Sequence, residues 1–215
     1  MLKAMIESPD CRAIIAHVKT TSEGIPKIFE NPKLQQKVFF VPVGVDIPEL
    51  LPRTTSDESI NLIFTGSWNQ TPQNFFLRGG LDTLYAFEKI AHRNPRVNLI
   101  LRSPIPDGEP MEVLKALREK YPDQIKIYSE FMEKDEWYQF LCNADIFILP
   151  SARIHVVSIL EAMSFELPVV VSDGWGISDY VDDGRTGVLI PGRYGIVSWY
   201  DEKTGMLRED YEPMY

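Results

Sequence analysis

Residues 147–190 read FILPSARIHVVSILEAMSFELPVVVSDGWGISDYVDDGRTGVLI, and this stretch decides the fold. It contains an apolar strand, a loop, a helix that we expect to open at Ser158, a second apolar strand and a Gly-rich turn. An open α/β sheet binds phosphorylated ligands where a helix starts beside the carboxyl ends of parallel strands. The stretch therefore predicts such a sheet, with an anion site at the start of this helix.

The same alternation of strands and helices runs through residues 60–191. We expect strands at 60–65, 97–101, 125–128, 145–149, 169–171 and 187–190, and helices at 79–93, 110–121, 134–142 and 158–165, with a short helix before the last strand. Strands separated by helices of this length imply parallel βαβ units with right-handed crossovers. The predicted fold class is α/β, with a Rossmann-like, doubly wound parallel sheet.

The segments outside 60–191 differ in character. Residues 1–46 contain a short apolar strand, a helical pattern and a second apolar run. Residues 47–59 (IPELLPRTTSDES) are rich in Pro, Ser, Thr and acidic residues, which is typical of a linker. The tail, residues 192–215, is charged and aromatic, and we expect it to pack on a partner or on another part of the protein.

Composition excludes several classes of protein. A formal net charge of −9 argues against nucleic acid or an anionic membrane as the main partner. The two cysteines, Cys11 and Cys142, lack metal or redox spacing, and the three histidines are scattered, so we expect no metal site and a cytoplasmic protein. No apolar run approaches the roughly 20 residues of a transmembrane helix. Peripheral contact with a membrane through another part of the protein stays open.

Four groups of residues match, in order, the pattern of a known enzyme family. They are Pro150-Ser151, Leu160-Glu161-Ala162-Met163, Pro168-Val169-Val170 and Asp183-Gly184-Arg185-Thr186-Gly187. The stretch resembles the donor-binding half of GT-B glycosyltransferases, the retaining "glycosyl transferases group 1" that carry a Glu-x7-Glu signature. In addition, KVFFVPVGVD at 37–46 resembles that family's passage from acceptor domain to donor domain. The resemblance implies that residues 1–46 are the end of an acceptor domain and residues 60–191 a donor domain.

The resemblance also implies an activity. Such an enzyme, here of hexosyltransferase type, moves a sugar from a nucleoside diphosphate sugar (NDP-sugar) to a sugar or glycoconjugate acceptor. The acceptor would be held by an N-terminal domain outside this chain, which alone would be incomplete and inactive. No cofactor or metal is implied, because side chains and a helix dipole can neutralise the departing diphosphate. Two other classes stay open: a non-catalytic NDP-sugar-binding module and an NDP-sugar epimerase-like enzyme.

The helix start carries the first candidate residues. Spacing alone makes Ser158 and Glu161 a capping box, S-x-x-E. The resemblance implies instead that backbone amides of Val157, Ser158 and Ile159 bind the diphosphate. Glu161 would accept hydrogen bonds from the ribose hydroxyls, a role that suits a carboxylate and can coexist with capping.

Three positions depart from the family's pattern. Arg153 stands where the family has its first glutamate, near the transferred sugar, and could contact a phosphate or an acidic donor sugar, or face water. His155 could act as an acid–base group or a sugar ligand, although a lone loop histidine is more often structural. Glu166 stands where the family has a glycine. These departures bear on the donor sugar and on activity.

A second candidate set surrounds residues 66–80. Gly66, Ser67, Arg78 and Gly79 resemble a motif whose basic side chains contact the donor phosphates, with Ser67 in place of the first basic residue. Arg78 can bind two phosphate oxygens at once, and Gly79 lets the backbone approach a ligand. The alternative for Arg78 is a solvated residue, although a cation near a helix start opposes the dipole. We expect Arg78 and Glu161 to be the catalytic pair.

Arg102, Phe131 and Met132 complete the candidate donor-binding residues. Arg102 follows the strand 97–101 at its carboxyl end, where it faces the expected crevice or forms a structural ion pair. Phe131 and Met132 fall where the family has an apolar wall around the nucleotide base. Isolated apolar residues are equally typical of a core, so both interpretations stay open.

Overall fold

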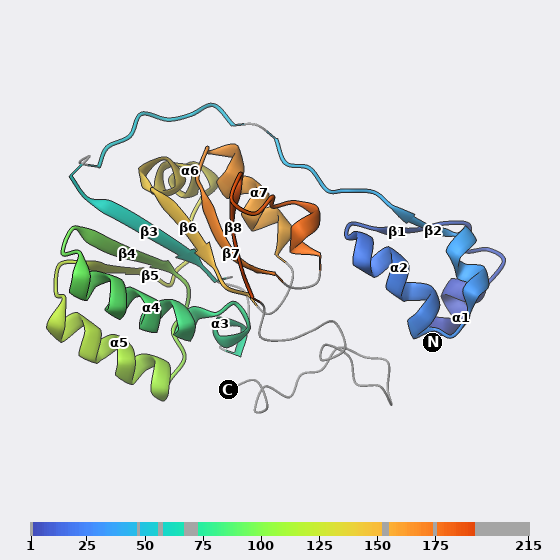
Figure 1. Ribbon diagram of the computed structural model, residues 1–215, viewed down its shortest axis with the longest axis horizontal. Coiled ribbons are helices and arrows are strands. Elements are labelled where there is room, and N and C mark those ends of the chain that lie inside the picture. The colour runs from blue at the N-terminus through green and yellow to red at the C-terminus, as the bar shows by residue number, and fades with distance from the viewer. Residues whose placement is uncertain are drawn as a thin grey trace.

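The computed structural model describes residues 2–46, 48–55, 58–66, 73–151, 155–173 and 176–191. Six parallel strands form one sheet in the order β5-β4-β3-β6-β7-β8 (Figure 1). The strands are β3 (Ile60–Thr65), β4 (Val97–Arg102), β5 (Ile125–Tyr128), β6 (Ile146–Leu149), β7 (Val169–Asp173) and β8 (Gly187–Pro191). The helices among them are α3 (Gln73–Leu77), α4 (Gly80–Arg93), α5 (Glu109–Lys120), α6 (Lys134–Asn143), α7 (Val156–Ser164) and the 3-10 helix η2 (Ile177–Asp179). The predicted Rossmann-like α/β fold is confirmed.

The order of the strands fixes where a ligand can bind. Strands β4 and β5 follow β3 on one side of it, and β6 then pairs with the other side of β3. As a result α4 and α5 cover one face of the sheet, and α6 and α7 cover the other (Figure 1). Sheets of this kind bind ligands at the carboxyl ends of the strands where the order reverses. That point lies just beyond Thr65 of β3 and Leu149 of β6.

The central strands are apolar on both faces because helices cover both. Phe64, Leu99 and Phe147 are fully buried in one continuous core. Phe75 of α3 packs edge-to-face on Phe64, with 5.8 Å between the ring centroids. Burial of one such side chain contributes about 2–3 kcal/mol. The core therefore explains why these strands read as continuous apolar runs rather than alternating ones.

Residues 2–46 form a small unit with its own cluster of buried residues. It consists of α1 (Leu2–Glu7), β1 (Ile14–Ala16), α2 (Lys19–Ile28), the 3-10 helix η1 (Pro32–Gln36) and β2 (Val38–Phe40). Strands β1 and β2 pair in parallel, and Ile6, Leu34 and Val38 pack together beneath them. The assignment of this unit to an acceptor domain stays a prediction.

The small unit contacts the large sheet domain at η2. The Lys19 amide donates to Asp179 Oδ2 at 2.8 Å, and the Val43 amide donates to the Tyr180 hydroxyl at 3.0 Å. Helix α2 has Val18 at its N-cap, whose side chain cannot accept a hydrogen bond. Asp179 therefore caps α2 from the other unit, with a negative charge at the positive end of the helix.

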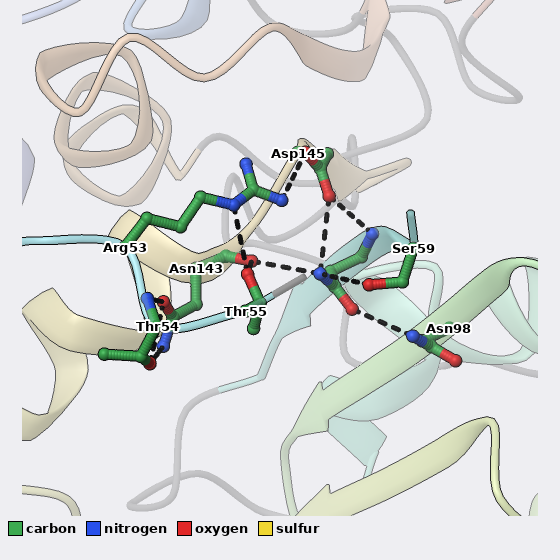
Figure 2. Close-up of polar contacts among 8 residues, drawn as sticks. Arg53, Thr54, Thr55, Ser59, Asn98, Asn143 and Asp145 are labelled. Atoms are coloured by element: carbon green, nitrogen blue, oxygen red, sulfur yellow. Dashed lines mark hydrogen bonds and ion pairs between the residues drawn. The ribbon is translucent and has the colours of Figure 1, made fainter. Parts of the chain in front are cut away.

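The linker is attached to the amino ends of β3 and β6 (Figure 2). The expected crevice lies at the other end of these strands. Arg53 forms an ion pair with Asp145 at 2.8 Å, and the Thr54 amide donates to Asn143 Oδ1 at 2.8 Å. The buried side chain of Asn61 donates to the Asn143 carbonyl at 3.2 Å. These contacts therefore attach the segment before β3 to the amino ends of β3 and β6, away from the carboxyl ends of the strands.

The largest difference from the sequence prediction is at α7. This helix begins at Val156 rather than Ser158, and His155 is its N-cap residue, with no side-chain cap hydrogen bond. The His155 carbonyl already accepts from the Ile159 amide at 3.3 Å, which starts the helix early. Ser158 thus lies inside the first turn, and the capping box with Glu161 is wrong.

Candidate functional site

The carboxyl ends of β3 and β4 lie in close contact. The Gly66 amide donates to the Arg102 carbonyl at 2.8 Å. A Cβ atom at position 66 would lie 2.0 Å from Ser103 Oγ, so any larger residue would force the two strand ends apart. Gly66 is therefore fixed by close packing. Ser67, the next candidate residue, lies outside the described residues.

Arg78 lies at these carboxyl ends, in the segment between α3 and α4. Its side chain is only 6% exposed, and its Nη1 donates to the Thr65 carbonyl at 3.3 Å. Its Nε has no hydrogen-bond partner, and no ion pair joins it to a carboxylate in the described part of the chain. Burial, together with the charge of Arg102, lowers the pKa of Arg78 from its ordinary value to about 10. The guanidinium is therefore a buried cation at neutral pH, and no carboxylate of the described residues pairs with it.

The loop after β6 holds the backbone around Arg78 in place. The Ser151 hydroxyl donates to the Leu77 carbonyl at 3.1 Å, and the Ser172 hydroxyl donates to the Ser151 carbonyl. Gly79 has a φ of 76°, and a Cβ atom there would lie 2.3 Å from the Pro150 carbonyl oxygen. These contacts place Arg78 beside the loop that leads into α7.

Arg102, the last residue of β4, lies near Arg78. Its Nη1 donates to Thr65 Oγ1 at 3.4 Å, and its Cζ lies 4.7 Å from the centroid of the Trp137 ring. Burial lowers the pKa of Arg102, and the charge of Glu161 opposes this shift. The structural ion pair considered from the sequence is absent from the described ranges, where Arg102 stacks on an aromatic ring instead.

The N-cap residue of α7, His155, makes no side-chain hydrogen bond to the first turn of the helix. The helix dipole makes this end of α7 positive. Of the predicted donors at 157–159, the Ile159 amide already donates to the His155 carbonyl. The Val157 side chain is exposed, whereas that of Ile159 is buried in the core. Arg153 falls outside the described residues.

Glu161 lies one turn further along α7 and lines a cavity of about 360 Å³. The other lining residues are Gly44, Val45, Asp46, Lys134 and Tyr138. The Lys134 ammonium lies 5.1 Å from the centroid of the Tyr138 ring. Its hydrogen bond to Tyr138, and more weakly the charges of Asp46 and Glu161, raise the pKa of Lys134. A half-buried carboxylate in this cavity can accept hydrogen bonds from ligand hydroxyls.

The sequence did not identify the residues that surround Glu161. Asp46 was visible only as part of the GVD at the end of the segment 37–46. Lys134 and Tyr138 belong to α6 and gave no signal, because an exposed Lys and a Tyr on a helix are ordinary surface residues. Only the packing of α6 beside α7 brings them to the cavity.

The two apolar candidates have different environments. Met132 is 5% exposed and belongs to the core, whereas Phe131 is 55% exposed in the loop between β5 and α6. Only Phe131 therefore offers a broad side-chain surface to a ligand. A wall of the base pocket at these residues stays a prediction.

The described residues contain no group of three or more His, Cys, Asp and Glu side chains placed to hold a metal ion. In the same ranges, no helix has the length and apolar character needed to cross a membrane. The described residues do offer two guanidinium groups at the carboxyl ends of β3 and β4, and a carboxylate on α7 whose charge acts on Arg102. This set suits a ligand that combines phosphate oxygens with hydroxyl groups.

Comparison with protein families identifies the lineage. Residues 59–200 match the family described as "Glycosyl transferases group 1". The chain belongs to this glycosyltransferase family. The match includes the six-stranded sheet, Arg78 and α7. Comparison with curated protein sequences gave no match.

Solved glycosyltransferase structures share the fold. A glycosyltransferase from Rickettsia africae matches with a TM-score of 0.64 and 13% identity, over 90% of this chain and 53% of that one. The pneumococcal O-GlcNAc transferase GtfA, solved with UDP and GlcNAc, matches with a TM-score of 0.65 and 16% identity. The match covers 90% of this chain and 36% of GtfA. HepE of Anabaena, solved with UDP and glucose, matches with a TM-score of 0.62 and 17% identity. The match covers 85% of this chain and 50% of HepE. The group 1 glycosyltransferase chain thus spans about half, or less, of these proteins and has the architecture of half a GT-B enzyme.

Proposed function

We propose that this glycosyltransferase chain is the donor-binding half of an enzyme that moves a hexosyl group from an NDP-sugar to a sugar or glycoconjugate. The observation that carries the proposal is the buried Arg78, which has no carboxylate partner among the described residues and lies at the carboxyl end of β3, close to Arg102. A buried charge costs several kcal/mol unless an opposite charge compensates it. The diphosphate of a donor would supply that charge, with bidentate hydrogen bonds to the guanidinium.

The site divides naturally between the parts of such a donor. Arg78 and the amides in the first turn of α7 bind the diphosphate, where negative charge grows as the sugar departs. Glu161, one turn along α7, accepts hydrogen bonds from the two ribose hydroxyls. Because a guanidinium and a helix start already offset the developing charge, we propose that transfer needs no metal ion.

The small N-terminal unit supports the acceptor side of the proposal. Parallel sheets are normally covered on both faces, and a two-stranded sheet is marginal by itself. Strands β1 and β2 nevertheless expose Ile15 (61%) and Phe39 (51%). We infer that a further α/β part carrying the acceptor site packs on this face. The chain by itself would then bind the donor without transferring the sugar.

Glu161→Ala tests the ribose role. Calorimetric titration with UDP, GDP and ADP selects the preferred nucleotide, and inorganic pyrophosphate serves as a second ligand without ribose. We expect the variant to bind the nucleotide more weakly by about 1–3 kcal/mol, because charge-assisted hydrogen bonds to the ribose are lost. Pyrophosphate affinity should not fall, because that ligand does not reach Glu161.

Glu119→Ala is the matched control, since Glu119 is exposed on α5 and the substitution removes the same charge. Equal nucleotide affinity in Glu161→Ala and the wild type would reject the ribose assignment. An equal loss for pyrophosphate and nucleotide would place Glu161 at the phosphates instead.

A further inference from the structure

The structure brings the side chains of Arg78 and Arg102 together at the carboxyl ends of β3 and β4. Both reach Thr65: Arg78 donates to its carbonyl at 3.3 Å, and Arg102 donates to its hydroxyl at 3.4 Å. Each has a buried Nε without a hydrogen-bond partner. Two adjacent like charges are unfavourable in a partly buried site, and a ligand with more than one negative charge would relieve the repulsion.

We propose that Arg102 is a second phosphate-binding cation of this site and that the Trp137 ring holds its guanidinium in position. The inference rests on the proposed function, because it concerns the same donor.

The geometry lets one ligand contact both guanidinium groups, because Arg78 Nη1 and Arg102 Nη1 both reach Thr65 at the carboxyl end of β3. The charges of Glu161 and Glu136 also act on Arg102 and oppose the lowering of its pKa by burial.

Trp137 holds Arg102 in a way that leaves its charge available. The indole lies on α6 and is 7% exposed, so its ring is fixed by the core around it. A guanidinium stacked on an indole is attracted by the π face of the ring, and more strongly when it is desolvated. A carboxylate partner would also orient Arg102, but it would compete with the ligand. The aromatic face positions the cation without neutralising it.

Calorimetry with pyrophosphate and the preferred nucleoside diphosphate tests the proposal. We expect Arg102→Gln to weaken both ligands by about tenfold or more and to reduce the dependence of binding on salt. Arg118→Gln is the control for net charge, because Arg118 is exposed in the last turn of α5. Arg102→Lys, which keeps the charge and loses the planar fork, should give an intermediate affinity.

A double-mutant cycle tests the positioning role of Trp137. We expect Trp137→Leu to weaken binding by about threefold or more in the wild-type background and by much less when Arg102→Gln is already present. Trp137→Phe keeps an aromatic face and should retain most of the affinity, which provides a variant with little change in packing. Equal losses in both backgrounds would show that Trp137 acts only through general packing and would overturn its role.

The same titrations separate this inference from the proposed function. If Arg78→Met weakens both ligands and Arg102→Gln binds like the wild type, the inference is wrong and the donor site stands. If the wild-type chain binds neither ligand, or if neither arginine matters, the donor site itself is rejected.

Discussion

Replacing Arg78 by methionine should make the unliganded protein more stable while removing most of its affinity for a nucleoside diphosphate. The buried guanidinium has lost its hydration, and among the described residues it gains a single hydrogen bond, to the Thr65 carbonyl. Methionine fills a similar volume without a charge, so we expect the free energy of unfolding to rise by about 1–3 kcal/mol. Affinity should fall by about 100-fold, because charge-assisted bonds to phosphate contribute about 1.5–3 kcal/mol.

The pKa of Arg78 indicates at which pH the stabilisation by Arg78→Met is largest. Its value of about 10 in the folded protein lies below the ordinary value of an arginine in the unfolded chain. The folded state therefore disfavours the charged form, and the full cost is present below about pH 10. The cost is lost only as the pH rises above about 10. At neutral pH the wild type carries all of it, so Arg78→Met should show its full stabilisation there.

Urea unfolding and calorimetry measure the two effects, in a buffer free of phosphate so that no anion occupies the site. Arg118→Met is the control, because it removes an exposed arginine from α5. We expect this control to change the free energy of unfolding by less than about 0.5 kcal/mol. If Arg78→Met lowers stability and leaves affinity intact, Arg78 is a structural residue and the donor site needs another location.

Gly79→Ala should destabilise the protein by about 3 kcal/mol or more. The residue has a φ of 76°, which costs an L-residue about 1–2 kcal/mol. The added Cβ would also lie 2.3 Å from the Pro150 carbonyl oxygen, a backbone atom that cannot move alone. Separation of the two segments would displace the neighbouring Arg78, so protein that still folds should bind pyrophosphate more weakly.

Gly184→Ala is the matched control for this prediction. Gly184 has nearly the same backbone conformation, with a φ of 72°, but no atom lies within 4 Å of its added Cβ. Thermal and urea unfolding should show a loss of about 1 kcal/mol for Gly184→Ala, which reflects backbone strain alone. Similar losses at Gly79 and Gly184 would mean that the contact with Pro150 is unimportant.

The sheet could be predicted because its strands are buried on both faces and therefore read as short apolar runs between turn residues. The start of α7 could not be predicted, since Ser158 and Glu161 offered a capping box that the structure does not use. The hydrogen bond from the Ile159 amide to the His155 carbonyl takes precedence over that local signal. Packing of the loop after β6 is invisible in the sequence of the helix itself.

The site was predictable only where a local motif marked it. Arg78 lies next to paired glycines, and Glu161 lies in a motif that follows a buried strand. The contact between Arg102 and Trp137 could not be foreseen, because the two residues come from different βα units and meet only when α6 packs on the sheet. Contacts of this kind depend on tertiary packing and produce no spacing pattern in the sequence.

The most direct test of the donor site is a crystal structure of this chain soaked with its preferred nucleoside diphosphate. The account predicts the diphosphate between Arg78 and the first turn of α7, with the ribose hydroxyls at Glu161. Nucleotide density in another place, such as the cavity lined by Glu166 and Arg185 at the other edge of the sheet, would contradict it. So would an empty site at saturating nucleotide.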